Sequence, residues 1–177
     1  RVVRAAAGED AVVIGDANGA WEPTEADGAI AALEAGTVDW IEQPVRGIEA
    51  MRTLARRTDV RIALDEDATD AQAFSLPPCA GAACLKLQAW GGPDRLLEAA
   101  DSARSAGIEV YLGSTFEGPV GIAASLHCAA AIGPDLPSGL ATLDSFDQRF
   151  PGVEIGDGSW LPTDRPGIGV DPDGNPA

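Results

Sequence analysis

Short apolar runs alternate along the chain with longer stretches in which apolar residues recur every three or four positions. The apolar runs predict strands at about residues 11–16, 38–42, 60–65, 82–87 and 108–113. The amphipathic stretches predict helices at about residues 23–35, 46–58, 68–75, 92–106 and 118–132. Regular alternation of strand and helix with short loops favours an α/β fold, in which right-handed crossovers join parallel strands.

The two ends of the chain depart from this alternation of predicted strands and helices. Residues 1–10 read as the last turns of an amphipathic helix that stops at Gly8, so the pattern begins in the middle of a βα unit. Beyond about residue 133 the sequence is rich in Pro and Gly and lacks helical periodicity. We therefore predict a partial (β/α) barrel over residues 1–150 and an irregular C-terminal tail over residues 151–177.

Acidic residues outnumber basic ones by 28 to 12, which gives a formal net charge of −16 at pH 7. Such a chain repels nucleic acid and anionic membrane surfaces, so we expect neither as a partner. The sequence has no apolar run of about 18 residues and no secretory leader pattern, so we expect a soluble cytoplasmic protein. The acidic excess indicates an acidic, solvent-exposed surface. A more specific hypothesis is that the protein comes from a salt-adapted organism.

Acidic side chains follow three of the predicted strands, and the only lysine of the chain follows a fourth. Asp16, Glu42 and Asp65 come directly after the runs AVVIG, VDWI and VRIAL, and Lys86 lies at the end of the next run. The steps between them are 26, 23 and 21 residues, about the length of one βα unit each. Because the carboxyl ends of parallel strands lie on one rim, we expect three carboxylates and one ammonium group to meet there.

Carboxylate oxygens are the ligands that Mg²⁺ prefers, and its near-octahedral coordination leaves positions for water or substrate. We therefore predict a Mg²⁺ site, with Mn²⁺ as an alternative ion. The cysteines Cys79, Cys84 and Cys128 lack the paired spacing of a zinc site and are interpreted as buried apolar residues, which disfavours zinc. With a substrate carboxylate on the metal, Lys86 would either accept a proton from the adjacent carbon or stabilise the resulting negative charge.

Four segments of the chain resemble the enolase superfamily in its muconate-lactonizing-enzyme branch. They are DANGAW, WIEQP, ALDED and LKLQAWGG, in that family's order and close to its spacing. The resemblance implies a TIM-type (β/α) barrel, of which this chain is the C-terminal domain without its first strands and without the capping domain. It also implies that Asp16, Glu42 and Asp65 are the metal ligands and that Lys86 is a catalytic lysine.

Polar residues beside the predicted ligands are candidates for supporting roles. Asn18 and Gln43 lie within the resembling motifs, and we expect them to orient the ligating carboxylates. Glu66, next to Asp65, is a further candidate for this task, with an ordinary solvated acid as the alternative interpretation.

Two segments in the second half of the chain carry a finer likeness. GSTFEGPVG at residues 113–121, followed by SGLAT at 138–142, looks most like the o-succinylbenzoate synthases of menaquinone biosynthesis. In those enzymes such a loop borders the substrate. The resemblance therefore implies that Ser114, Thr115 and Glu117 contact a small carboxylate substrate.

The family's pattern is incomplete in this sequence. The resemblance implies a KxK motif at the end of an earlier strand, and none occurs because Lys86 is the only lysine. An exposed edge at the first strand would need a partner, so we expect the chain to associate with a missing N-terminal part or with a second copy of itself.

These features favour a Mg²⁺-dependent enzyme that removes a proton next to a carboxylate through an enediolate intermediate. The reaction most consistent with the resemblance is o-succinylbenzoate synthase-like dehydration, a lyase reaction. Within the superfamily, the alternatives are a racemase or epimerase of dipeptides or N-acylamino acids and a muconate cycloisomerase-like enzyme. An inactive metal-binding remnant is the alternative from a different class.

Overall fold

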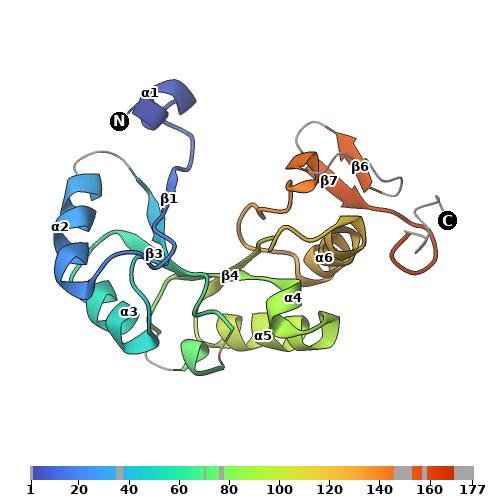
Figure 1. Ribbon diagram of the computed structural model, residues 1–177. Coiled ribbons are helices and arrows are strands. Elements are labelled where there is room, and N and C mark those ends of the chain that lie inside the picture. Colours follow the sequence, from blue (N-terminus) through green and yellow to red (C-terminus); the bar gives the residue numbers. More distant parts are fainter. Residues whose placement is uncertain are drawn as a thin grey trace. The chain divides into compact units, whose positions relative to one another are not determined.

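The computed structural model describes residues 2–34, 38–69, 71–75, 78–145, 153–156 and 159–169 (Figure 1). The strands are β1 (Ile14–Asp16), β2 (Trp40–Glu42), β3 (Arg61–Leu64), β4 (Ala82–Leu85), β5 (Glu109–Leu112), β6 (Val153–Gly156) and β7 (Ser159–Pro162). The helices are α1 (Val2–Ala7), α2 (Pro23–Glu34), α3 (Ile48–Ala55), α4 (Leu87–Trp90), α5 (Pro93–Ser105) and α6 (Pro119–Ile132), with 3-10 turns η1 (Ala71–Phe74) and η2 (Leu143–Ser145). None of the helices in these ranges is long and apolar enough to cross a membrane.

The first five strands form one sheet in the order β1-β2-β3-β4-β5. The pairings from β1 to β4 are parallel, with Asp16 opposite Glu42 and Glu42 opposite Ala63. Parallel pairing brings the carboxyl ends of these strands to the same edge of the sheet. The predicted α/β fold is confirmed, and each predicted strand of the sheet is present within its predicted range.

The chain divides into two compact units, one of residues 1–84 and 102–109 and the other of residues 85–101 and 110–177. In the first unit, α2 and α3 pack side by side next to the strands (Figure 1). Buried apolar side chains from α2, α3, β2 and β3 form its core, namely Ile30, Ile41, Met51, Ile62 and Leu64. Burial of each such side chain stabilises the fold by about 1.5–3 kcal/mol.

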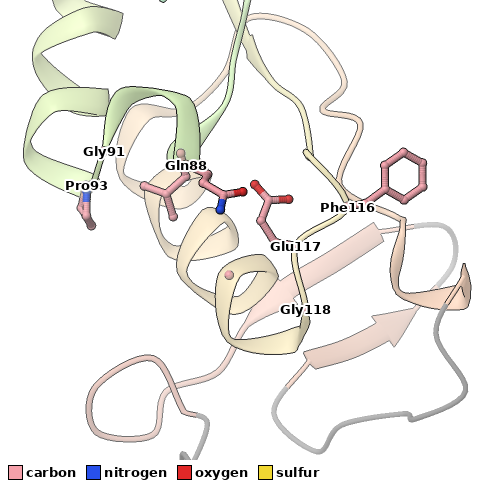
Figure 2. A pocket seen from close by; sticks show the side chains of 9 residues that line it. Gln88, Gly91, Pro93, Phe116, Glu117 and Gly118 are labelled. Atoms are coloured by element: carbon pink, nitrogen blue, oxygen red, sulfur yellow. The ribbon is translucent and has the colours of Figure 1, made fainter.

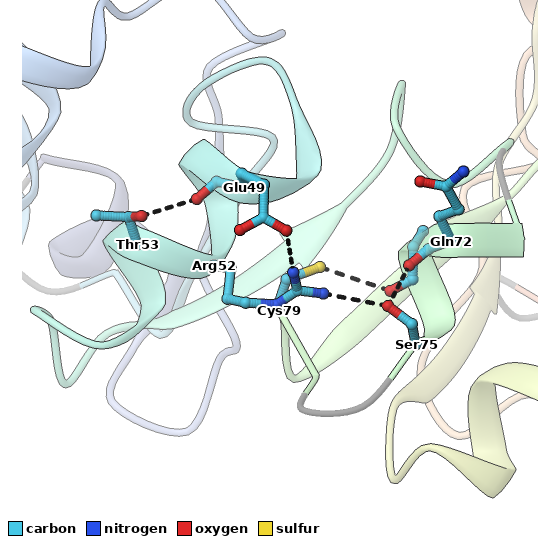
Figure 3. A network of polar contacts seen from close by, with 7 residues as sticks. Glu49, Arg52, Thr53, Gln72, Ser75 and Cys79 are labelled. Carbon is cyan, nitrogen blue, oxygen red and sulfur yellow. Dashed lines mark hydrogen bonds and ion pairs between the residues drawn. The ribbon is translucent and has the colours of Figure 1, made fainter.

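A polar network ties α3 to η1 within the first unit (Figure 3). Arg52 pairs with the Glu49 carboxylate one turn earlier and also donates to Ser75 Oγ at 3.2 Å. Ser75 Oγ in turn donates to the carbonyl of Gln72 at 2.8 Å. The buried Cys79 donates to the carbonyl of Ala73, and burial raises the pKa of its thiol. These contacts fix the loop before β4 and involve none of the predicted site residues.

The start of the chain is held to β1 and β2 through a buried arginine. Arg4 of α1 donates to the carbonyl of Ala11 and pairs with Asp39, with Nη2 at 2.5 Å from Oδ2. The same carboxylate accepts a hydrogen bond from the Val13 N–H at 2.6 Å. Strand β1 lies at the edge of the sheet, and its residue Ile14 is 44% exposed. Within the described ranges, no strand pairs with the outer edge of β1.

In the second unit, α6 packs against α4 and against β7 of the hairpin β6–β7 (Figure 1). The apolar helix α6 begins with Pro119 in its first turn and ends at Gly133, whose left-handed conformation (φ 58°) closes the helix. Its buried face includes Ile122, Leu126 and Ile132.

The structure differs from the prediction in three places. Within the helix predicted at residues 68–75, the described residues form only the 3-10 turn η1. The strand predicted to reach residue 87 ends at Leu85, and residues 87–90 form the short helix α4, which is too brief to show helical periodicity. Part of the tail predicted to be irregular forms the antiparallel hairpin of β6 and β7. The sequence carries the signal for this hairpin, since an Asp-Gly pair at 157–158 separates two short alternating runs. The rest of that tail lies largely outside the described residues.

Candidate active site

Glu42, Asp65 and Cys84 come together at the edge of the sheet in the first unit. Glu42 is the last residue of β2, Asp65 directly follows β3, and Cys84 lies within β4. Their oxygen and sulfur ligand atoms all lie within 4.8 Å of one another. Asp65 is buried and Glu42 is half-buried, and carboxylate oxygens so close together are the ligands that hard divalent cations prefer. This donor set therefore fits a divalent cation.

Cys84 is buried, as the sequence predicts, but the sequence does not predict that its sulfur lies beside the two carboxylates. All four residues of β4 are buried, so the strand shows no alternation from which the direction of a side chain could be inferred. A thiol is a soft ligand, whereas carboxylates suit Mg²⁺ and Mn²⁺. The two carboxylates therefore suit a hard cation, whereas the Cys84 thiol would favour a softer metal.

Asp16 stands opposite Glu42 in the parallel register, but its carboxylate is not one of the three clustered groups. It is exposed, and its Oδ1 accepts a hydrogen bond from the Asn18 N–H at 2.8 Å. Asn18 adopts a left-handed backbone conformation (φ 51°) that allows this short turn. The structure therefore brings two of the three predicted ligands together and places the third on the adjacent strand.

Gln43 is the most completely bonded polar side chain of the site. It is fully buried and lies between Glu42 and the start of the following loop, with φ 35°. Its Oε1 accepts from the backbone N–H of Asp65 at 2.8 Å and of Asp67 at 3.2 Å. Its Nε2 donates to the Val45 carbonyl at 2.8 Å and to Asp67 Oδ2 at 2.7 Å. One side chain thus fixes the backbone at Asp65 relative to the end of β2.

Asp67, two positions after Asp65 in the sequence, completes this network. Its Oδ2 accepts from Gln43 and also from the Gly47 N–H at 2.7 Å, which joins the loops after β2 and β3. Glu66 is half-buried, and its Oε2 is a buried atom without a hydrogen-bond partner among the described residues. Of the three residues predicted to support the ligands, Gln43 therefore has the clearest contacts.

Lys86 lies in the second unit, directly after β4. Its backbone is extended (φ −117°, ψ 121°), it precedes the first residue of α4, and its side chain is half-buried. The prediction that the lysine stands at the carboxyl end of a strand is confirmed by this position.

The segments 113–121 and 138–142 lie side by side in the second unit. The Ser114 N–H donates to the Gly139 carbonyl at 3.1 Å, and Ser114 Oγ lies 2.8 Å from Thr142 Oγ1. Glu117 Oε2 accepts from Ser114 Oγ at 2.6 Å and from the Thr115 N–H at 2.8 Å. Burial raises the pKa of Glu117, but hydrogen bonds from Ser114, from its own N–H and from Thr115 outweigh it and hold the pKa below its usual range.

A pocket of about 610 Å³ opens beside this loop (Figure 2). Gln88 and Glu117 point toward one another across it, and Leu87 and Pro93 contribute apolar wall. Phe116 also borders the pocket, while its ring turns outward. The sequence analysis missed Gln88 and Phe116. The sequence signal that could have pointed to Gln88 and Phe116 is the pair Gly91-Gly92, because two glycines leave open space beside the loop at residues 113–121.

Comparison with known proteins identifies relatives of this chain. Residues 1–176 match the family model described as enolase C-terminal domain-like. The o-succinylbenzoate synthase of Mycobacterium tuberculosis is 41% identical over 139 residues, which cover 75% of this chain and 41% of that protein. The chloromuconate cycloisomerase of Pseudomonas putida is 35% identical over 177 residues, covering 94% of this chain and 47% of that protein. The chain thus spans less than half the length of these relatives.

Solved structures show the same fold. The muconate lactonizing enzyme from Pseudomonas putida has a TM-score of 0.81 and 28% identity, covering 95% of this chain and 49% of that one. The L-Ala-D/L-Glu epimerase from Bacillus subtilis has a TM-score of 0.85, covering 94% of this chain and 49% of that one. Because the sequence identity is only 23%, this similarity shows the fold alone. The predicted TIM-type architecture and superfamily are therefore confirmed: the chain belongs to the enolase C-terminal domain-like family.

Proposed function

We propose that the protein to which these residues belong removes a proton next to the carboxylate of a small substrate, through an enediolate intermediate and with Mg²⁺ as cofactor. The specific reaction proposed is o-succinylbenzoate synthase-like dehydration in menaquinone biosynthesis. The observation that carries the proposal is the convergence of Glu42 and Asp65 at the carboxyl ends of adjacent parallel strands. The synthase relative, 41% identical, supports the choice of reaction.

Glu42, Asp65 and Asp16 would hold the cation. Adjacent strands lie about 4.8 Å apart, so carboxylates on neighbouring strands can share one ion with oxygens at about 2.1 Å from it. Asp16 would join by turning its carboxylate from the Asn18 N–H, and Gln43 would keep the backbone of Asp65 in place. The bound Mg²⁺, or Mn²⁺ in its place, would neutralise the carboxylate charge that grows as the proton leaves.

Lys86 and the loop at Ser114 supply the remaining groups of the proposal. As an ammonium group, Lys86 would stabilise the negative charge of the intermediate. Ser114, Thr115 and Glu117 would contact the substrate, and the lowered pKa of Glu117 keeps its carboxylate ionised to a more acidic pH than an ordinary glutamate.

The test measures product formation by the full-length protein. Lys86→Ala is expected to abolish formation of o-succinylbenzoate from its cyclohexadiene precursor, whereas Lys86→Arg keeps a cation and is expected to retain a trace. Arg56→Ala, on the exposed end of α3, serves as a matched loss of one positive charge and should leave turnover unchanged. Full turnover by the Lys86→Ala enzyme would overturn the assignment.

An epimerase is the second candidate. The dipeptide epimerase from Enterococcus faecalis V583 is 32% identical with a TM-score of 0.72, covering 79% of this chain and 42% of that one. In that case Lys86 would exchange the α-proton of one substrate enantiomer. Enantiomer-selective exchange in deuterated water, without aromatic product, would replace the dehydratase by the epimerase. Neither activity in the full-length protein would favour an inactive metal-binding remnant.

Two further proposals concern the association of this chain with a partner and the cellular compartment of the protein. The exposed outer edge of β1 supports association with an N-terminal part of the protein or with a second copy. The three cysteines of the chain are buried and form no disulfide bond, which supports a reducing compartment such as the cytoplasm. A sedimentation experiment on the 177-residue chain tests the first proposal, because a stable monomer would contradict it.

A further inference from the structure

The two clustered carboxylates of the first unit have a sulfur atom within reach. The parallel register pairs Leu64 of β3 with Ala83 of β4, so the next position places Asp65 beside Cys84. Glu42 of β2 pairs with the residue two positions before Asp65, and residues two apart in a strand share one face of the sheet. The three side chains therefore lie on the same face, and their oxygen and sulfur atoms are within 4.8 Å of one another.

The spacing of these atoms is close to that of a zinc site. Bonds of about 2.0–2.3 Å to a tetrahedral Zn²⁺ ion place its ligand atoms about 3.5 Å apart. Asp65 and Cys84 are buried, so the sheet holds both of them in place. Glu42 is half-buried and ends its strand, so its side chain can move by the distance of about 1 Å that closes the site around an ion.

The sulfur atom changes which ion these three side chains prefer. Mg²⁺ binds oxygen ligands in near-octahedral geometry and keeps several waters, so it gains little from a thiol. Zn²⁺ accepts carboxylate and thiolate ligands, and in many sites it binds three protein groups and keeps one open position. Thiolate ligands favour Zn²⁺, whereas carboxylates and water suit Mg²⁺. Glu42, Asp65 and Cys84 together supply three ligands of the kinds that Zn²⁺ binds.

We propose that Glu42, Asp65 and the Cys84 thiolate form a Zn²⁺ site that overlaps the proposed Mg²⁺ site, and that Zn²⁺ inhibits the enzyme by displacing Mg²⁺. One ion excludes the other because both need the same two carboxylates. Tetrahedral Zn²⁺ keeps one open position, whereas octahedral Mg²⁺ offers several to substrate and water. The inhibition rests on the proposed function, whereas Zn²⁺ binding requires only the three side chains.

The test uses Co²⁺ as a spectroscopic substitute for Zn²⁺, because a Co²⁺–thiolate bond gives a charge-transfer absorption that oxygen ligands do not give. Co²⁺ is titrated into the metal-free full-length protein in the presence of a phosphine reductant. One bound Co²⁺ should produce this absorption, and an equimolar amount of Zn²⁺ should remove it. Excess Mg²⁺ should shift the titration to higher Co²⁺ concentration. Binding of Co²⁺ without the thiolate absorption would overturn the proposal.

Two cysteine variants locate the sulfur ligand. Cys84→Ser, which replaces sulfur by oxygen at similar size, should lose the absorption and bind Zn²⁺ at least about tenfold more weakly. Its Mn²⁺ affinity should stay within about threefold of the native value, which also shows that the variant is folded. If Cys84→Ser loses Mn²⁺ binding, the Co²⁺ absorption of the native protein decides. The control Cys79→Ser alters another buried cysteine, outside the three clustered groups, and should keep the absorption and the native Zn²⁺ affinity.

The outcomes separate this inference from the proposed reaction. Zn²⁺ should inhibit product formation by the native protein, and half-inhibition of Cys84→Ser should need at least about tenfold more Zn²⁺. Unchanged Zn²⁺ affinity in Cys84→Ser, or full turnover by the Zn²⁺-saturated native protein, would contradict the proposal. Mn²⁺ binding without Co²⁺–thiolate absorption would overturn the Zn²⁺ site and leave the proposed Mg²⁺ site standing. Thiolate-bound Co²⁺ in a protein that forms no product would support the Zn²⁺ site and overturn the proposed dehydration.

Discussion

Replacing Gln43 by leucine should destabilise the protein strongly, because this side chain makes four hydrogen bonds in a fully buried position. Leucine fills a similar volume but leaves the Asp65 N–H and the Val45 carbonyl buried and unsatisfied, at about 1–3 kcal/mol each. The groups of the half-buried Asp67 can recover hydrogen bonds to water. The expected loss is about 3–4 kcal/mol, which lowers Tm by about 10 °C in a chain of this size.

Thermal and urea unfolding followed by circular dichroism measure this change. The control is Gln72→Leu, which alters an exposed glutamine and should shift Tm by less than about 2 °C. Gln43→Glu is a second variant, which keeps the acceptor for Asp65 but places a carboxylate against Asp67, and it should also destabilise. A Tm for Gln43→Leu within about 2 °C of the native protein would refute the role assigned to this network.

Three further outcomes are expected. Cys84→Ala should leave Mg²⁺ affinity within about threefold while reducing Cd²⁺ affinity, since only a soft metal gains from the thiol; calorimetry with both ions distinguishes them. Hydrogen bonds from the Val13 N–H and from Arg4 lower the pKa of Asp39. The stability that Asp39 contributes is therefore present above about pH 4 and is lost as the pH falls through the lowered pKa. Asp39→Asn should remove this part of the acid dependence of the unfolding free energy, measured in urea melts. Met51→Ala should cost about 2–5 kcal/mol in urea unfolding, because Met51 is fully buried in the core; a loss below about 1 kcal/mol would contradict that packing.

Residues at strand ends were the most predictable part of the site. Glu42 and Asp65 each close a short apolar run, and parallel pairing of β2 with β3 brings such positions together whatever the details of the loops. The same rule located Lys86. It also located Asp16, which ends β1 opposite Glu42, but it does not predict that the Asn18 N–H holds the Asp16 carboxylate.

Other features of the site depend on tertiary contacts, which produce no periodic pattern of apolar residues in the sequence. Cys84 lies in a strand that is buried throughout, so no alternation marks the direction of its side chain. Asp67 matters because its carboxylate reaches Gly47 N–H, 20 positions earlier in the chain. Gln88 belongs to a four-residue helix, and Glu117 faces it only because Phe116 adopts a left-handed conformation. Such backbone choices follow from packing rather than from local preference.

The central claim is that Glu42 and Asp65 hold a divalent cation, and Mn²⁺ titration monitored by electron paramagnetic resonance tests it most directly. The full chain should bind one Mn²⁺ that excess Mg²⁺ displaces. Glu42→Gln and Asp65→Asn should each weaken this binding at least about tenfold, since each removes one charged ligand of a hard-cation site. Glu9→Gln, on an exposed turn, should bind Mn²⁺ like the native chain. Equal Mn²⁺ affinity in the native chain and in the Glu42→Gln and Asp65→Asn variants would contradict the claim.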